Sequence, residues 1–140
     1  MVSGKSIVVT GAASGIGRAC ARRLLDDGNR IVAVDLDRGS LEENFGPETG
    51  ELRYFAGDVA RTATADGAAA VALDAFGGID GLAHFAAAHS KLNWERADED
   101  EFNRIMSINV TGPFLMAKAC AKVMIDQGTK GAMVLTASGG

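Results

Sequence analysis

Three glycines near the amino terminus have the types and spacing of a phosphate-binding turn. Gly11, Gly15 and Gly17 follow a short apolar run and precede a stretch with helical apolar spacing. The first backbone N–H groups of a helix are unpaired and carry partial positive charge, so they attract anions. We expect Gly11 to allow the turn, Gly15 to let backbone approach a phosphate, and Gly17 to let the helix pack closely on the strand. An ordinary structural turn is the alternative interpretation.

A carboxylate closes the second apolar run of the sequence. Asp35 ends residues 30–35, at the separation from Gly11 where dinucleotide-binding folds place the group that holds the adenosine ribose hydroxyls. Its negative charge would repel a 2′-phosphate, which favours NAD over NADP. Arg38 lies close enough in sequence to weaken this preference. The alternative is a solvated aspartate that caps the next turn.

Asp58 and Val59 follow the third apolar run. The Asp58 carboxylate could accept a hydrogen bond from an adenine amino group while Val59 packs on the ring. Aspartate is equally an ordinary N-cap for the helix that follows. Both interpretations stay open at this stage.

The apolar pattern alternates between strands and helices along the whole chain. Such alternation is typical of right-handed βαβ units on a parallel sheet, so we expect an α/β, doubly wound fold with strand order 3-2-1-4-5. Ligands of such sheets bind at the carboxyl ends of the strands where the order reverses. The predicted strands are 6–10, 30–35, 52–56, 81–86 and 132–137, and the predicted helices are 15–27, 38–45, 62–76 and 98–127, the last bent at Gly112 and Pro113. Apolar spacing predicts that the first helix faces inward with Ile16, Ala19, Cys20 and Leu24.

These features together resemble the short-chain dehydrogenase/reductase family. Its glycine pattern, Thr-Gly-x-x-x-Gly-x-Gly, is matched at Thr10, Gly11, Gly15 and Gly17, and the resemblance continues through Asp35, Asp58, Val59, residues 108–114 and residues 133–138. It spans essentially all of residues 1–140, but only about the first half of a typical family domain. The resemblance therefore implies one Rossmann-type domain whose sheet stops after strand five. It implies that cofactor is contacted by Gly11, Ser14, Gly15, Ile16, Gly17, Asp35, Leu36, Asp58, Val59 and Ala86.

The resemblance also implies two catalytic positions, Asn109 and Ser138. Ser138 matches the serine that hydrogen-bonds the substrate carbonyl or hydroxyl, and Asn109 matches the catalytic asparagine. Physical reasoning adds to the second match: in a helix, Pro113 has no N–H to donate to the carbonyl of Asn109, which leaves that carbonyl free to hold a water. A plain proline kink is the alternative. The implied function is NAD(H)-dependent hydride transfer on a small-molecule alcohol or ketone.

The chain departs from the family pattern at two places. Residues 84–87 read His-Phe-Ala-Ala where the family has Asn-Asn-Ala-Gly, and we interpret His84 as a core histidine rather than a proton carrier. The family's acid/base pair, Tyr-x-x-x-Lys, does not occur. The one tyrosine, Tyr54, lies in a predicted strand and is followed four residues later by Asp58. We therefore expect these residues by themselves to bind NAD weakly and to lack dehydrogenase activity.

Composition narrows the partners that the chain could have. A net charge of −4 without a Lys/Arg cluster argues against nucleic acid, and the apolar runs are too short for a membrane span. Cys20 and Cys120 have no metal-ligand spacing and are expected to be reduced thiols of a cytoplasmic protein. The helical region 98–127 carries more apolar residues than one face can hold, which predicts a homo-oligomer. Burial against the sheet and against the family's next helix is the alternative. Three interpretations remain open: part of a dehydrogenase, a non-catalytic NAD-binding module, or a self-associating protein without a ligand.

Overall fold

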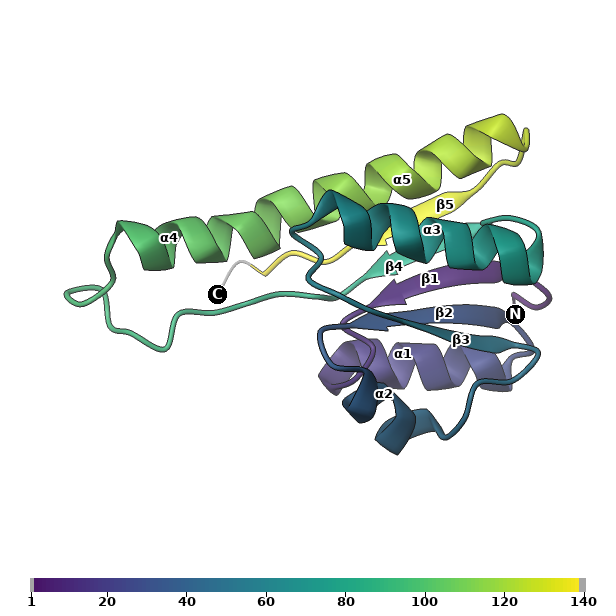
Figure 1. Cartoon of the computed structure of the whole chain (residues 1–140), viewed down its shortest axis with the longest axis horizontal. Coiled ribbons are helices and arrows are strands. Elements are labelled where there is room, and N and C mark those ends of the chain that lie inside the picture. The colour runs from purple at the N-terminus through teal and green to yellow at the C-terminus, as the bar shows by residue number, and fades with distance from the viewer. Residues whose placement is uncertain (1, 139–140) are drawn as a thin grey trace.

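A five-stranded parallel sheet forms the centre of the computed structural model, which describes residues 2–138 (Figure 1). The strand order is β3-β2-β1-β4-β5, as predicted. Strand order reverses between β1 and β4, so the carboxyl ends of these two strands flank the switch point. The strands are β1 (Ser6–Thr10), β2 (Arg30–Asp35), β3 (Leu52–Ala56), β4 (Gly81–His84) and β5 (Ala132–Leu135).

Helices cover both faces of this sheet (Figure 1). Helices α1 and α2 lie on one face, whereas α3 and α5 lie on the other and pack against each other. The helical elements are α1 (Gly15–Asp26), α2 (Arg38–Phe45), α3 (Thr62–Phe76), α4 (Glu99–Met106), the π-helical turn η1 (Ser107–Thr111) and α5 (Gly112–Asp126). This arrangement confirms the predicted doubly wound α/β fold.

Alternate side chains of the central strands pack into two separate hydrophobic cores, one on each face of the sheet. Val8 and Val32 point toward α3 and α5, where they join Met116 of α5. Val9 and Ile31 point to the opposite face and pack beneath α1. All five are completely buried, and each contributes about 1.5–3 kcal/mol of transfer free energy by leaving water. The two cores fix the strands whose ends carry the candidate site.

Strands β4 and β5 each end two residues earlier than predicted. β4 stops at His84, and the N–H groups of Phe85 and Ala86 donate to the Thr10 hydroxyl oxygen. β5 stops at Leu135, and the N–H and hydroxyl of Thr136 both donate to the carbonyl of His84. The chain therefore leaves the sheet at the level of the cleft described below.

The predicted inward face of α1 was wrong at its first turn. Ile16 is 73% exposed and Ala19 is exposed, whereas Gly17 and Ala21 are buried. The buried side begins at Gly17, because only a residue without a side chain fits against the carbonyl of Gly11. The remaining predicted positions, Cys20 and Leu24, are half-buried.

The long helical region is interrupted just before the predicted bend. Residues 107–111 form a π-helical turn, in which the N–H of Gly112 donates to the carbonyl of Ser107, five residues earlier. Pro113 follows at once and has no N–H, so the carbonyl of Asn109 has no donor four residues ahead. The irregularity thus lies on the residues around Asn109 and not at Gly112 itself.

By length and hydropathy, residues 99–126 are the one described helical stretch that could cross a bilayer, a test that core helices of soluble proteins also pass. In the structure, Met116, Cys120 and Met124 of this stretch are buried against the sheet and α3. Burial raises the pKa of the Cys120 thiol to about 12, so the thiol stays protonated. Core packing accounts for much of the apolar composition of α5.

Candidate functional site

A cleft of about 920 Å³ opens at the carboxyl ends of the strands, on both sides of the switch point. It is lined by turns that follow β1, β2, β3, β4 and β5, and by the π-helical turn with the residues next to it. All residues predicted to bind cofactor or to act in catalysis line this cleft, namely Gly11, Ser14, Gly15, Ile16, Gly17, Asp35, Leu36, Asp58, Val59, Ala86, Asn109 and Ser138.

The glycine turn approaches the backbone beyond β4 more closely than a side chain allows. Gly11 has φ +66°, and a Cβ on it would lie 2.8 Å from the backbone nitrogen of Ala86. A Cβ on Gly17 would collide with the carbonyl of Gly11, so α1 can begin where it does only with glycine. At Gly15 (φ +52°) a Cβ would meet nothing within 4 Å, because this residue faces the open cleft.

The N-terminus of α1 is not capped by any side chain of the described residues. Ser14 occupies the N-cap position, yet its hydroxyl makes no capping hydrogen bond. Asp37 caps α2 and Asp98 caps α4 through their carboxylates, whereas Arg61 at the N-cap of α3 makes no side-chain capping hydrogen bond, as at α1. The first N–H groups of α1 are therefore left to the cleft, an arrangement that favours a bound anion.

Asp35 links the end of β2 to the glycine turn through hydrogen bonds. One carboxylate oxygen accepts the N–H of Ala13 at 2.8 Å, and the other accepts the N–H of Leu36 at 2.8 Å. Asn44 of α2 holds the same turn from the other side, because its amide donates to the carbonyl of Ala13 at 2.9 Å. A carboxylate can accept about four hydrogen bonds, so Asp35 retains acceptor capacity for a ligand.

Arg38 does not line the cleft, although its neighbours Asp35 and Leu36 do. Its guanidinium is paired with Glu42 and Glu48 and lies over the ring of Tyr54. The sequence suggested that Arg38 weakens the preference for NAD, and its position in the structure shows it engaged elsewhere.

Asp58 caps a turn and not the following helix. Its Oδ1 accepts the N–H of Ala60 at 2.9 Å, whereas the N-cap position of α3 is Arg61. The predicted N-cap alternative for Asp58 was therefore wrong. Val59 is 5% exposed and packs beside Gly112, so it forms the floor between β3 and α5.

Thr10 fixes both the backbone beyond β4 and the ring of His84. Its Oγ1 accepts the N–H groups of Phe85 at 3.1 Å and Ala86 at 3.2 Å. Having accepted two hydrogen bonds, the hydroxyl must donate its own hydrogen to Nδ1 of His84, 2.9 Å away. We therefore assign the proton of the neutral imidazole to Nε2.

The Nε2 atom of His84 is buried and has no hydrogen-bond partner among the described residues. The residue is 2% exposed, which agrees with a core position, although only one ring nitrogen is satisfied. Burial lowers the pKa of His84, and the backbone of Ala86 partly opposes this effect. His84 is therefore a neutral side chain at neutral pH.

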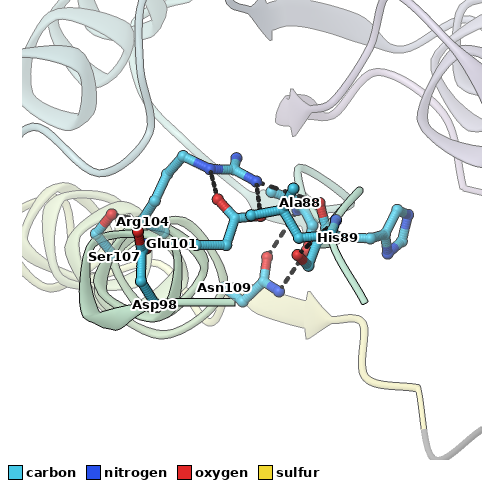
Figure 2. A network of polar contacts seen from close by, with 9 residues as sticks. Ala88, His89, Asp98, Glu101, Arg104, Ser107 and Asn109 are labelled. Carbon is cyan, nitrogen blue, oxygen red and sulfur yellow. Dashed lines mark hydrogen bonds and ion pairs between the residues drawn. The ribbon is translucent and has the colours of Figure 1, made fainter. Parts of the chain in front are cut away.

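Asn109 anchors the loop that follows β4 (Figure 2). Its Oδ1 accepts the N–H of Ala88 and its Nδ2 donates to the carbonyl of Ala88, each at 2.8 Å. The side chain is thus fully engaged with backbone, whereas its own carbonyl lies in the π-helical turn. That the backbone carbonyl of Asn109 holds a water stays a prediction.

Sequence reasoning missed a second anchor of the same loop (Figure 2). Arg104 donates to the carbonyl of His89 at 3.2 Å and pairs with Glu101 through Nε and Nη2 at 2.8 and 2.9 Å. The hydrogen bond from Arg104 lowers the pKa of Glu101 to about 2, with a smaller effect from Ser90. The spacing of Glu101 and Arg104 on a helix was the signal that could have indicated this pair.

Ser138 lies beyond the end of β5, is exposed, and lines the same cleft as the glycine turn. Tyr54 is in a different place. It is 3% exposed in β3, and its hydroxyl donates to the carbonyl of Gly46 at 2.7 Å. The one tyrosine of the chain therefore serves the packing of β3 and is absent from the described residues that line the cleft.

A doubly wound parallel sheet with a glycine turn and a carboxylate at the end of β2 is an arrangement that nucleotide-binding α/β proteins have. Comparison with known families makes the class specific, because the family model described as "short chain dehydrogenase" matches residues 5–140. The chain belongs to the short-chain dehydrogenase family.

Curated relatives cover nearly the whole chain. A 2,5-dichloro-2,5-cyclohexadiene-1,4-diol dehydrogenase of Sphingobium indicum is 38% identical over 138 residues, which are 98% of this chain and 55% of the relative. A D-threitol dehydrogenase of Mycolicibacterium smegmatis is 39% identical over 140 residues, which are 98% of this chain and 54% of the relative. The chain therefore spans about half the length of these relatives.

Solved structures agree with this assignment. The 3-ketoacyl-(acyl-carrier-protein) reductase from Brucella melitensis, complexed with NADH, superposes with a TM-score of 0.81 at 32% identity. The match covers 90% of this chain and 52% of that one. A nicotinamide cofactor is thus a property of a structural neighbour of this chain.

Proposed function

We propose that this chain forms the cofactor-binding part of an NAD(H)-dependent dehydrogenase that interconverts an alcohol and a carbonyl group. The observation that carries the proposal is the joint placement, in one cleft, of the uncapped N-terminus of α1 and the Asp35 carboxylate. An anion-attracting helix end and an anion-repelling carboxylate suit a pyrophosphate and an unphosphorylated ribose respectively.

The residues present fit such a cofactor. Gly15 leaves the N-terminus of α1 open for the pyrophosphate, and Asp35 has free lone pairs for the ribose hydroxyls. Asp58 and Val59 line the adenine side of the cleft, and Ala86 lines the passage toward β5. When bound, the nicotinamide supplies or accepts the hydride. NADP is disfavoured by the Asp35 charge.

Asn109 and Ser138 are proposed to serve the reacting end of the cleft. Asn109 holds the loop at Ala88 through its side chain, which leaves its backbone carbonyl to bind a water in a proton path. Ser138 would donate a hydrogen bond to the substrate oxygen and orient it. Each of these groups positions an oxygen, and neither is an acid or base near neutral pH.

We further propose that these 140 residues by themselves bind NADH without turnover. Alcohol–carbonyl interconversion needs a group that transfers a proton near neutral pH, and the described residues that line the cleft include no tyrosine. His84 lines the cleft, but its Nε2 is buried and its Nδ1 is engaged by Thr10. The test is NADH fluorescence titration together with an assay of NADH oxidation by a panel of small ketones. Saturable binding without oxidation is expected, and ordinary turnover would contradict the proposal.

A homo-oligomer through α4 and α5 is a further part of the proposed function. Phe102, Met106, Val110 and Phe114 recur every fourth residue along this helical region, and all four are exposed. The stripe is left uncovered by α3 and the sheet, so it suits a second copy of the chain. Light scattering should give a dimer or larger, and the Val110→Lys variant should shift toward monomer. A monomer at micromolar concentration would contradict this assembly.

A further inference from the structure

Arg38 is the cationic side chain nearest in sequence to the proposed ribose carboxylate, yet it is turned away from the cleft. Asp35 and Leu36 line the cleft, and Arg38 follows two residues later in the first turn of α2. A guanidinium is a strong phosphate ligand, since its planar fork can form two parallel hydrogen bonds. Where Arg38 points therefore matters for which dinucleotide the cleft accepts.

Three side chains hold Arg38 in its observed position. Its Nε donates to Glu42 Oε1 at 2.8 Å, and its Nη2 lies 3.4 Å from Glu48 Oε2. Its guanidinium carbon lies 5.5 Å from the centroid of the Tyr54 ring. Two carboxylates and one aromatic face thus share the charge of Arg38, and we call these three residues the Arg38 clamp.

The clamp is itself fixed by the backbone around β3. Tyr54 is 3% exposed, and its hydroxyl is bonded to the carbonyl of Gly46. Glu48 uses its second oxygen, Oε1, to accept the N–H of Tyr54 at 2.8 Å. The edge strand β3 and the loop before it hold two of the three clamp members, Glu48 and Tyr54, in place, whereas the side chains of Arg38 and Glu42 are each about half exposed.

The other anion-attracting group in this region is also occupied. The Asp37 carboxylate accepts the N–H groups of Gly39 and Ser40, so it takes the place that an anion would occupy at the N-terminus of α2. Asp35, the last residue of β2, and Asp37, the N-cap of α2, both place negative charge at this end of the sheet. With Arg38 diverted, no cation from residues 35–38 lines the cleft.

We infer that Glu42, Glu48 and Tyr54 are specificity-determining residues that exclude the 2′-phosphate of NADP by holding Arg38 away from the ribose end of the cleft. The inference rests on the proposed function, since it assumes a dinucleotide in the cleft. Holding Arg38 away from the cleft would disfavour NADP in addition to the repulsion of the 2′-phosphate by Asp35. Releasing Arg38 should let its guanidinium reach a 2′-phosphate and offset part of that repulsion.

The test compares NADH and NADPH binding by fluorescence titration of the full chain and its variants. In E42A/E48Q, Arg38 loses both carboxylates, while the amide introduced at position 48 keeps an oxygen for the N–H of Tyr54. The ratio of the NADPH to the NADH dissociation constant should fall by about tenfold, the size of one charge-assisted hydrogen bond to phosphate. Adding R38A to this background should restore the original ratio.

A matched control separates contact from net charge. E43A/E51Q removes two negative charges from the same helix and the same loop region, but neither residue contacts Arg38. Its ratio should stay within about twofold of the parent, because exposed charges are screened by solvent and salt. Circular dichroism establishes that each variant is folded.

Three outcomes would overturn the inference. An unchanged ratio in E42A/E48Q, with NADH still bound, would show that the clamp has no role in selection. An equal fall in E43A/E51Q would assign the effect to net charge. Absence of NADH binding by the parent chain would overturn the proposed function itself, so the two failures are distinguishable.

Discussion

The two halves of the sheet differ in how deeply their strands are buried and in how many hydrogen bonds hold their turns. On the β1-β2-β3 side, the central strands are buried and the turn residues are tied by Asp35 and Asn44. On the β4-β5 side, three of the four residues of β5 are exposed, Val134 and Leu135 among them. The exposed apolar residues of β5 lie outside the cleft, which is lined after β5 by residues 136–138. We call the part of the lining that follows β1, β2 and β3 the β1–β3 wall, and the part that follows β4 and β5, with the π-helical turn, the β4–β5 wall.

The residues proposed to bind the cofactor and the residues proposed to act on the substrate lie in different walls of the cleft. The groups proposed to hold the adenosine and the pyrophosphate come from the β1–β3 wall, where hydrogen bonds within the described residues fix them. The groups proposed to act on substrate, Asn109 and Ser138, come from the other wall and are exposed. We therefore expect substitutions in the two walls to have unequal effects, and the following predictions test this inequality.

The largest contrast should come from truncating one apolar side chain on each side. Ile31→Ala removes a completely buried side chain of β2 and should lower the free energy of unfolding by about 2–5 kcal/mol. Leu135→Ala, at 49% exposure in β5, should cost less than about 1 kcal/mol. Urea denaturation measures both. Equal losses would remove the distinction between the two halves of the sheet.

The glycine turn should tolerate no side chain at its tightest position. Gly17→Ala places a Cβ against the carbonyl of Gly11 and should cost about 1–3 kcal/mol of stability. Gly50→Ala is the matched control, because a Cβ there meets nothing within 4 Å. Thermal unfolding followed by circular dichroism compares them. Equal melting temperatures would show that the close packing of α1 on the turn is not required.

A smaller, local effect is expected in the other wall. Asn109→Ala removes both hydrogen bonds to Ala88 and should weaken the loop after β4 by about 1 kcal/mol. Hydrogen exchange at the Ala88 amide should accelerate roughly fivefold, since that free energy sets the exchange rate of a local opening. Asn103→Ala on the same helical region serves as the control. Unchanged protection at Ala88 would contradict the anchoring role.

The last of these predictions concerns the pH dependence of stability. Burial lowers the pKa of His84 in the folded state, so the unfolded chain binds more protons between that value and about 6.5. Stability should therefore fall as pH drops below about 6.5, by at most about 1.4 kcal/mol per pH unit. His84→Asn should flatten this dependence between about pH 7 and pH 5.5 in urea titrations. A slope unchanged by the substitution would assign it to other groups.

Sequence patterns predicted most of the fold, because glycine spacing and apolar runs depend on local geometry. The strand order followed from the alternation of elements. The cleft residues followed from the ends of the strands together with the resemblance to the short-chain dehydrogenase/reductase family. The exposure of Ile16 was missed, since it depends on the tertiary contact between Gly17 and Gly11. The early end of β4 was missed because the Thr10 hydroxyl takes the next N–H groups.

Contacts between side chains that are far apart in the sequence could not be predicted from sequence patterns. Arg38 could be placed near Asp35 by number, but its diversion depends on Glu48 and Tyr54, which come from a later loop and strand. The tautomer of His84 likewise depends on how many hydrogen bonds Thr10 already accepts. Such long-range contacts decide the electrostatics of the cleft, and they emerge only once the chain is folded.

The central claim is that the β1–β3 wall binds NAD. NADH fluorescence titration of the chain and its Asp35→Asn variant tests this claim most directly. Asp26→Asn, an exposed aspartate at the far end of α1, is the matched control. We predict a saturable fluorescence increase in the parent chain and in the control. The affinity for NADH should be about tenfold weaker in Asp35→Asn, because a charged acceptor for the ribose hydroxyls is lost. Absence of saturable binding by the parent chain, or equal affinity in Asp35→Asn, would contradict it.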